Sequence, residues 1–129
     1  MKIGVVILGH GSRASIDEAN QVLITLVERL KEKVSLEQVN IDFLAPAFMN
    51  PESQRPNLKQ AVVEMVLVGA EKIIIAPVFL SNGIHIQKDI PAEIIRLKEK
   101  YRVEIKMAPH LGADPRISDI IMERIKEVI

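Results

Sequence analysis

The 129-residue sequence contains no cysteine, and only 3% of its residues are aromatic. The lack of cysteine excludes disulfide bonds, thiolate metal sites and a cysteine nucleophile, so any metal site depends on histidine and carboxylate side chains. Hydrophobic residues nevertheless make up 48% of the chain. A core of this composition consists mainly of aliphatic side chains, as in parallel sheets that are covered by helices.

The sequence also lacks an excess of charge of either sign, because 17 Lys and Arg residues balance 17 Asp and Glu residues. No global field therefore attracts nucleic acid or an anionic membrane, and an anionic ligand needs a local cluster of cations. No apolar run reaches the roughly 18 residues of a membrane span, and the run at the N-terminus is too short for a signal-peptide core. We expect a cytoplasmic protein without nucleic-acid or membrane partners.

Four strand-like segments alternate with four helical patterns, which predicts one domain over residues 1–129. The expected strands are 2–8, 39–44, 72–79 and 102–107, and the expected helices are 15–30, 57–68, 89–100 and 114–128. This alternation predicts an α/β fold of three αβα layers around a four-stranded parallel sheet of flavodoxin-like order 2-1-3-4. In that order the first and third strands are neighbours, and ligands bind in the crevice at their carboxyl ends.

Local motifs indicate where the helices and loops lie. Ser15 begins a capping-box pattern, and Asp89 and Asp114 are expected to cap helices that start near a proline. Residues 45–56 contain three prolines and are predicted to form a loop. The helix at 57–68 is apolar nearly all the way round, so it is buried on more than one side, and the second side could belong to another subunit.

Two histidines follow the first and third predicted strands. His10 lies between Gly9 and Gly11, and His85 lies 75 positions later, after Gly83. The predicted topology brings both histidines to one edge of the sheet, and the glycines let the backbone turn and a ligand approach. Because neutral imidazole binds divalent metals and takes up a proton near neutral pH, the pair indicates metal binding or proton transfer.

The two histidines also fit two other functions. A phosphoryl-transfer enzyme could use His10 as a phosphohistidine, although several arginines usually converge on a phosphate and only Arg13 is well placed here. A metal carrier or sensor could use the same histidines without a catalytic cleft.

Three separated motifs carry a resemblance to a known family. LGHGSR at 8–13, PVFLSNGIHIQKDIP at 77–91 and PHLGADPR at 109–116 together resemble the class II tetrapyrrole chelatases. In particular, they resemble the small sirohydrochlorin cobalt or nickel chelatases and the related sirohydrochlorin ferrochelatases, and the likeness extends from residue 3 to residue 128. The resemblance implies a lyase that inserts Co²⁺, Ni²⁺ or Fe²⁺ into sirohydrochlorin without ATP. The metal is then a substrate, no cofactor is permanently bound, and the small members form homodimers with the cleft between subunits.

The same resemblance implies roles for individual residues. His10 and His85 would be the metal-binding and catalytic pair, which holds the metal and accepts the pyrrole protons. The substrate carries many carboxylates, so a neutral protein must place cations beside it. The candidate cations are Arg13, Lys88, Arg55 and Arg116. The residues expected to bind the substrate are Gly11, Ser12, Arg13, Ser81, Asn82, Gly83 and Lys88.

The sequence departs from the chelatase pattern after the second strand. A glutamate is expected in relatives at the place of Ala45. Either Asp42 or Glu52 replaces that carboxylate, or the histidines act alone. His110 ends the fourth predicted strand, and it is either a further ligand or a residue of the surrounding loop.

Overall fold

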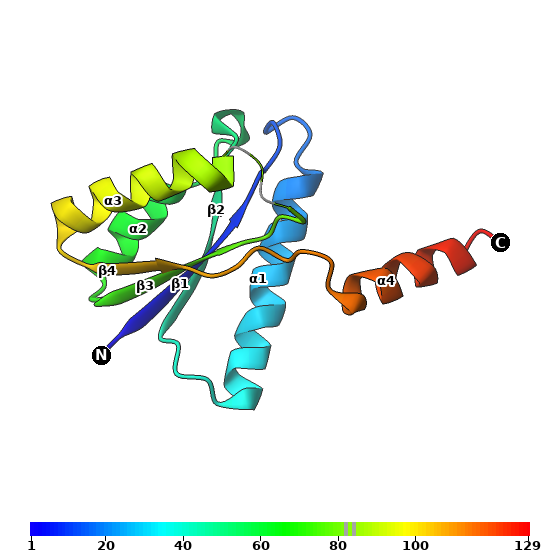
Figure 1. The fold of residues 1–129 in the computed structure, drawn as a ribbon, viewed down its shortest axis with the longest axis horizontal. Coiled ribbons are helices and arrows are strands. Elements are labelled where there is room, and N and C mark those ends of the chain that lie inside the picture. The colour runs from blue at the N-terminus through cyan, green and yellow to red at the C-terminus, as the bar shows by residue number, and fades with distance from the viewer. Residues whose placement is uncertain (82, 84) are drawn as a thin grey trace.

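The computed structural model of the chain describes residues 1–81, 83 and 85–129, and Figure 1 shows its fold. Four parallel strands form one sheet of order β2-β1-β3-β4, which confirms the predicted topology. The strands are β1 (Ile3–Gly9), β2 (Phe43–Phe48), β3 (Lys72–Pro77) and β4 (Glu104–Met107). The helices are α1 (Glu18–Glu37), α2 (Leu58–Leu67), α3 (Ile90–Tyr101) and α4 (Pro115–Lys126), with a short 3-10 turn at Pro51–Ser53 and a π-helical turn at His85–Asp89.

The sheet separates two hydrophobic clusters. Helices α2 and α3 cover one face and α1 covers the other (Figure 1), which gives the three predicted layers. In β3, Ile73 and Ile75 are fully buried toward α2 and α3, whereas Ile74 and Ala76 are half-buried on the α1 face. A strand that is apolar on both faces is typical of a parallel sheet between helical layers.

Within one chain, helix α2 buries a single stripe. Its buried residues Leu58, Ala61, Val62 and Met65 are spaced i, i+3, i+4 and i+7, and they pack in the larger cluster with residues of the sheet and of α3. Burial of a second side of α2 against another subunit therefore stays a prediction. Two apolar residues at its C-terminal end, Leu67 and Val68, are exposed.

Strand β2 begins four residues later than predicted. The prolines of residues 45–56 indicate a loop, but Ala45 and Pro46 pair with β1 opposite Val6 and Ile7. Since β2 is an edge strand of the sheet, it tolerates a residue that has no backbone N–H to donate. The loop after β2 therefore starts only after Phe48.

Two of the predicted helix caps are wrong and one is confirmed. Helix α1 begins at Glu18 rather than near Ser15, because residues 13–16 form a turn in which the amide of Ile16 bonds to the carbonyl of Arg13. The backbone of Asp89 is helical and the π-helical turn runs directly into α3, so Asp89 makes no side-chain cap. The Asp114 carboxylate does cap α4, because it accepts a bond from the amide of Arg116 at 2.9 Å.

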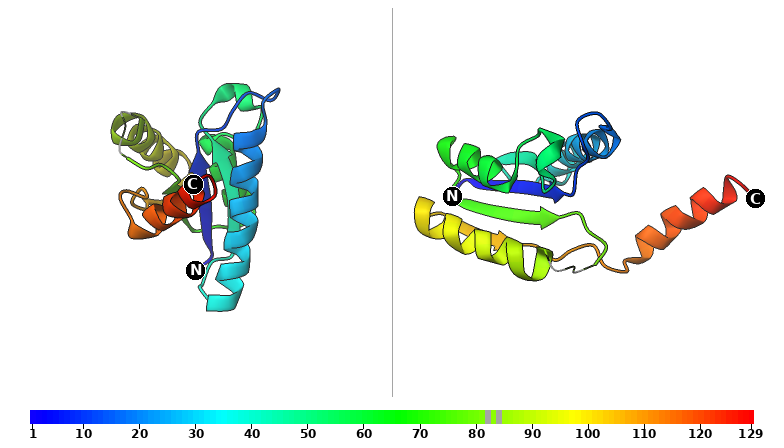
Figure 2. Two further views of the ribbon diagram at one scale, coloured as in Figure 1. Left: turned by 90° about the vertical axis from the view of Figure 1, so that its right-hand side faces the viewer. Right: turned by 90° about the horizontal axis from the view of Figure 1, so that it is seen from above.

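Helix α4 extends away from the rest of the chain (Figure 2), and none of its residues is buried. Its apolar side chains Ile120, Ile121 and Met122 are each about half exposed, and Ile125 is 44% exposed. Amphipathic helices owe most of their stability to the packing of the apolar face, and this face has no cover within the described chain. Separately, no helix in the described part of the chain combines the length and apolar character of a membrane-crossing segment.

The sheet core predicts one large and one small effect of mutation. Ile75→Ala removes a fully buried side chain from the central strand β3, and it is expected to lower the free energy of unfolding by about 2–5 kcal/mol. Ile95→Ala, at a 57% exposed position of α3, is the matched control and is expected to change it by less than about 0.5 kcal/mol. Urea denaturation measures both values. Equal effects of the two substitutions would contradict this assignment of the core.

Candidate functional site

The segments that follow the four strands meet at one edge of the sheet. The amide of Val78 bonds to the carbonyl of Leu8 at 2.8 Å, and the amide of Met49 bonds to the carbonyl of Gly9 at 2.9 Å. On the other side, the amide of Leu111 bonds to the carbonyl of Phe79 at 2.9 Å. The loops after β1 and β2 lie side by side at the top of Figure 1. This is the carboxyl edge, where open parallel sheets bind their ligands.

His10 is held on two sides at this edge. Its ring lies 4.3 Å from the ring of Phe79, measured between centroids, and its carbonyl accepts a bond from the amide of Asn50 at 2.8 Å. Phe79 is itself buried, while the side chain of His10 is exposed. The imidazole is therefore anchored by a rigid aromatic neighbour and remains open to a ligand.

A cavity of about 440 Å³ lies beside His10. It is bounded by the loop after β1, the first turns of α1 and the end of β3. Its lining residues are Gly9, His10, Gly11, Ser12, Ile16, Glu18, Ala19, Val22, Leu23, Leu26 and Val78. The lining is mostly apolar with a few polar groups at one end, and the volume is in the range of small-molecule sites.

The two glycines around His10 serve different purposes. Gly11 has a φ of +77°, a left-handed conformation that glycine adopts without strain, and a Cβ there would lie 3.0 Å from atoms of Asn20 and Phe48. Gly9 permits close packing of α1, because a Cβ would lie 2.9 Å from a methyl group of Leu23. The expectation that Gly9 leaves room for a ligand is thus corrected, since Leu23 occupies that space. A Cβ on Gly83, by contrast, would meet no atom of the described residues within 4 Å.

The backbone of His85 belongs to the π-helical turn between β3 and α3. Its side chain, and the whole of Asn82, lie outside the described residues, so the pairing of the two imidazoles stays a prediction. Ser81, Gly83 and Lys88 are exposed in the same connection. Among the side chains that the structure describes, no three His, Asp or Glu residues form a metal-binding cluster.

Three of the four candidate cations have acidic partners. Arg13 pairs with Glu52 at 2.9 Å, and both side chains are more than 60% exposed. Arg116 forms a close ion pair with Asp114 at 2.7 Å, within its own helix start. The side-chain and backbone hydrogen bonds from Arg116 hold the pKa of Asp114 well below its usual value.

The third paired cation, Arg55, is half-buried and bonds to Asp17 at 2.7 Å. Hydrogen bonds from Gln21, Asn20 and Arg55 to this carboxylate lower the pKa of Asp17. Arg55 is therefore bound into the protein's own loop structure, which argues against its expected role as a free cation for the substrate.

The expected carboxylate replacements for Ala45 lie at opposite ends of the sheet. Asp42 accepts a bond from the amide of Ile3 at 2.8 Å, at the amino end of β1, so the suggestion that it assists the histidines is wrong. Ala45 is in the middle of β2 and packs against the larger cluster, away from the carboxyl edge. Glu52 lies in the loop after β2, at the same edge as His10. Its carbonyl accepts a bond from the amide of Ala14, in the loop after β1, at 3.1 Å.

His110 is half-buried and directly precedes Leu111, whose amide bonds to the carbonyl of Phe79. Its backbone is thus beside the residue that packs on His10. The structure brings His110 to the same edge of the sheet, as predicted, and leaves its role as a ligand a prediction.

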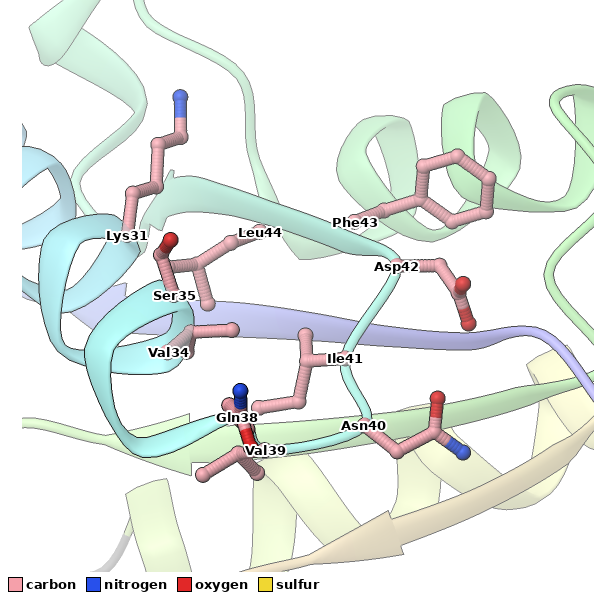
Figure 3. A pocket seen from close by; sticks show the side chains of 10 residues that line it. All are labelled: Lys31, Val34, Ser35, Gln38, Val39, Asn40, Ile41, Asp42, Phe43 and Leu44. Carbon is pink, nitrogen blue, oxygen red and sulfur yellow. The ribbon is translucent and has the colours of Figure 1, made fainter.

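A second cavity, of about 620 Å³, lies at the amino end of the sheet (Figure 3). It is formed by the last turns of α1 and the start of β2. Its lining residues are Lys31, Val34, Ser35, Gln38, Val39, Asn40, Ile41, Asp42, Phe43 and Leu44. The three sequence motifs do not reach this end of the sheet, so the cavity beside His10 is the candidate site.

Sequence reasoning missed two residues of this site, Phe79 and Asn20. The pattern of the third strand indicates Phe79 only as a strand end. Asn20 is fully buried and bonds to both backbone groups of Ser12, at 2.9 and 3.1 Å. A signal was present, because Asn20 shares the buried stripe of α1 with Leu23 and Val27 at helical spacing.

Comparisons with known proteins agree with the resemblance of the three motifs. The sirohydrochlorin cobaltochelatase of Methanothermobacter thermautotrophicus is 34% identical over 99% of this chain and 94% of its own length. The sirohydrochlorin ferrochelatase of Priestia megaterium is 32% identical over 95% of this chain, which spans only 43% of that protein.

Solved structures and a family description extend this agreement. The sirohydrochlorin chelatase SirB from Bacillus subtilis subspecies spizizenii, in complex with cobalt, matches with a TM-score of 0.84 and 26% identity. The match covers 99% of this chain and 51% of SirB. The family description CbiX matches residues 4–128, and the chain belongs to the CbiX family.

Proposed function

We propose that this protein inserts a divalent metal ion, Co²⁺, Ni²⁺ or Fe²⁺, into sirohydrochlorin. One observation carries the proposal. A chain that belongs to the CbiX family over residues 4–128 places its exposed His10 on the wall of an apolar cavity at the carboxyl edge of the sheet. The names of its relatives, cobaltochelatases and ferrochelatases, support the choice of substrate and reaction.

The residues present suit the two chemical demands of metal insertion. The incoming ion must be held loosely enough to be released, and imidazole ligands with open coordination positions meet this demand better than a closed site does. The macrocycle must lose two pyrrole protons, which a neutral imidazole can accept. His10 is proposed to serve both purposes together with His85, and the metal is a substrate rather than a resident cofactor.

The carboxylates of the substrate need a cation that can change partners. Arg13 is the best placed, because its ion pair with Glu52 is exposed at the surface. Such pairs contribute only about 0–1 kcal/mol, so a carboxylate of the substrate can replace Glu52 on the guanidinium group. Lys88, which is exposed in the turn after β3, is proposed as the second cation.

Glu52 is the carboxylate proposed to assist the histidines, because Ala45 lies within β2 and away from the carboxyl edge. Its loop contacts the turn of His10 through the bond from the Asn50 amide to the His10 carbonyl. A carboxylate released from Arg13 by the substrate would remain beside this turn. It could then assist either metal binding or proton uptake.

We further propose that two copies of the chain form a homodimer with the cleft between them. The chain spans about half of the ferrochelatase and of SirB, so a second copy would supply what the other half supplies in those proteins. The exposed apolar face of α4 supports this arrangement, because it needs a cover that the described part of the same chain does not provide. A cytoplasmic location stays a prediction.

The reaction is tested by mixing the purified protein with sirohydrochlorin and each metal, and by following the tetrapyrrole absorption spectrum. Insertion should exceed the uncatalysed rate, and His10→Ala and His85→Ala should each lower it by a factor of about 10²–10⁴, the usual contribution of a general base. Asn40→Ala, in the cavity at the amino end of the sheet, is the control and should retain activity within a few-fold.

Other results would point elsewhere. Binding of Co²⁺ without any change of the tetrapyrrole spectrum would favour a carrier or sensor. Phosphatase turnover without insertion would favour phosphoryl transfer. Full activity of His85→Ala would remove His85 from the mechanism.

The dimer is tested by sedimentation equilibrium. The protein should have about twice the 14.4 kDa mass of one chain, and Ile121→Asp combined with Ile125→Asp should give the single-chain mass, because charges on the apolar face of α4 prevent its burial. Glu123→Lys, on the opposite face of the helix, is the control and should leave the mass unchanged. A wild-type protein that sediments as one chain would contradict the proposal.

A further inference from the structure

Asn20 is a polar side chain at a position where helix α1 otherwise buries aliphatic ones. It has no exposed surface, and it lies on one stripe with Leu23 and Val27, which are also buried. Burial of an amide without partners is costly, and a leucine at this position would continue the stripe. A buried asparagine at such a position is therefore stable only because its hydrogen bonds are satisfied.

The hydrogen bonds of Asn20 converge on the turn that carries His10. Its Oδ1 accepts from the amide of Ser12 at 2.9 Å, and its Nδ2 donates to the carbonyl of Ser12 at 3.1 Å. Binding both backbone groups of one residue fixes the position and the orientation of that residue. Ser12 is separated from His10 only by Gly11, whose left-handed backbone packs against Asn20 and Phe48.

Asp17 fixes the orientation of the Asn20 amide. Its Oδ1 accepts a bond from Nδ2 of Asn20 at 2.6 Å, and its Oδ2 accepts from Gln21 at 2.9 Å and from Arg55 at 2.7 Å. Because an ionised carboxylate can only accept, Nδ2 must face Asp17 and Oδ1 must face the amide of Ser12. Arg55 also links this network to the loop after β2, which binds the carbonyl of His10 through Asn50.

We infer that Asn20 is a positioning residue for His10: it holds the Gly11–Ser12 backbone so that the imidazole stays against Phe79 and beside the cavity. The inference rests on the proposed role of His10 in metal binding. Asn20 is not among the residues that line the cavity. It acts through the backbone, as residues that orient metal ligands do, and loss of such a residue typically costs about 10–100-fold in metal affinity or activity.

The experiment compares Asn20→Ala and Asn20→Leu with Gln21→Ala. Asn20→Ala removes both hydrogen bonds between residue 20 and the Ser12 backbone, and Asn20→Leu removes them too but keeps the apolar stripe of α1 filled. Gln21→Ala is the matched control, since it also removes a hydrogen bond to Asp17 but leaves Ser12 untouched. The probe is Co²⁺ alone, titrated by calorimetry, together with the imidazole ¹H–¹⁵N spectrum of His10 and hydrogen exchange of the Ser12 amide.

Asn20→Ala should weaken Co²⁺ binding by about 10-fold or more, shift the His10 imidazole signals and speed exchange at Ser12, all below the unfolding temperature. Asn20→Leu should have an effect of similar size, and it provides the test if Asn20→Ala does not fold. Gln21→Ala should match the wild type. A purely structural role of Asn20 would lower only the unfolding temperature and leave Co²⁺ affinity and the His10 signals unchanged, which would overturn the inference.

His10→Ala separates this inference from the proposed function. If His10→Ala loses Co²⁺ binding while both Asn20 variants retain it, only the positioning role fails. If His10→Ala binds Co²⁺ as the wild type does, the proposed metal site itself fails, and the His10 spectrum of the Asn20 variants still reports whether the turn has moved.

Discussion

The parallel pairing of β1 with β3 is the constraint on which the candidate site depends. Six residue pairs, from Ile3–Lys72 to Leu8–Pro77, hold the two strands in register, and the bond from the Val78 amide to the Leu8 carbonyl extends the pairing by one step. The register brings the ends of two strands, and the loops that follow them, to one edge of the sheet although they are far apart in sequence. The fully buried Ile73 and Ile75 stabilise this pairing from the α2–α3 side.

The other face of the sheet is less completely covered. Helix α1 packs over β1 and β2. Ile74 and Ala76 of β3, and Val78 directly after it, are only half-buried on this face. The cavity beside His10 lies along this boundary, where Val22 and Leu26 of α1 are exposed. An exposed apolar wall next to a polar turn suits a flat, partly hydrophobic ligand, and it also suits closure by a second chain.

The elements that could be predicted from sequence are those whose burial follows from local pattern. The apolar runs of β1 and β3 identify two central strands, and the order of elements then defines the topology. The start of β2 could not be predicted, because Pro46 is compatible with a strand only at a sheet edge, and edge position is a property of the whole fold. The capping box predicted at Ser15 is also wrong, because residues 13–16 form a turn and α1 begins only at Glu18. Asn20 was missed because its partner is the backbone of Ser12.

Several departures from ordinary local structure gather around the carboxyl edge of the sheet. Gly11 has a left-handed backbone, Asn20 occupies an apolar helix position, and a π-helical turn at His85–Asp89 precedes α3. Asn20 departs from the apolar pattern of its helix, and π-helical turns are frequent at functional sites. Natural sequences keep such departures where function requires them, while elsewhere propensity, pattern and packing agree. Left-handed residues also occur elsewhere, for example at Gln38 beside the larger cavity. Asn20 differs from these, because a fully buried polar side chain bonds to the turn that carries His10. This direct link is an argument for function that is independent of the family relationship.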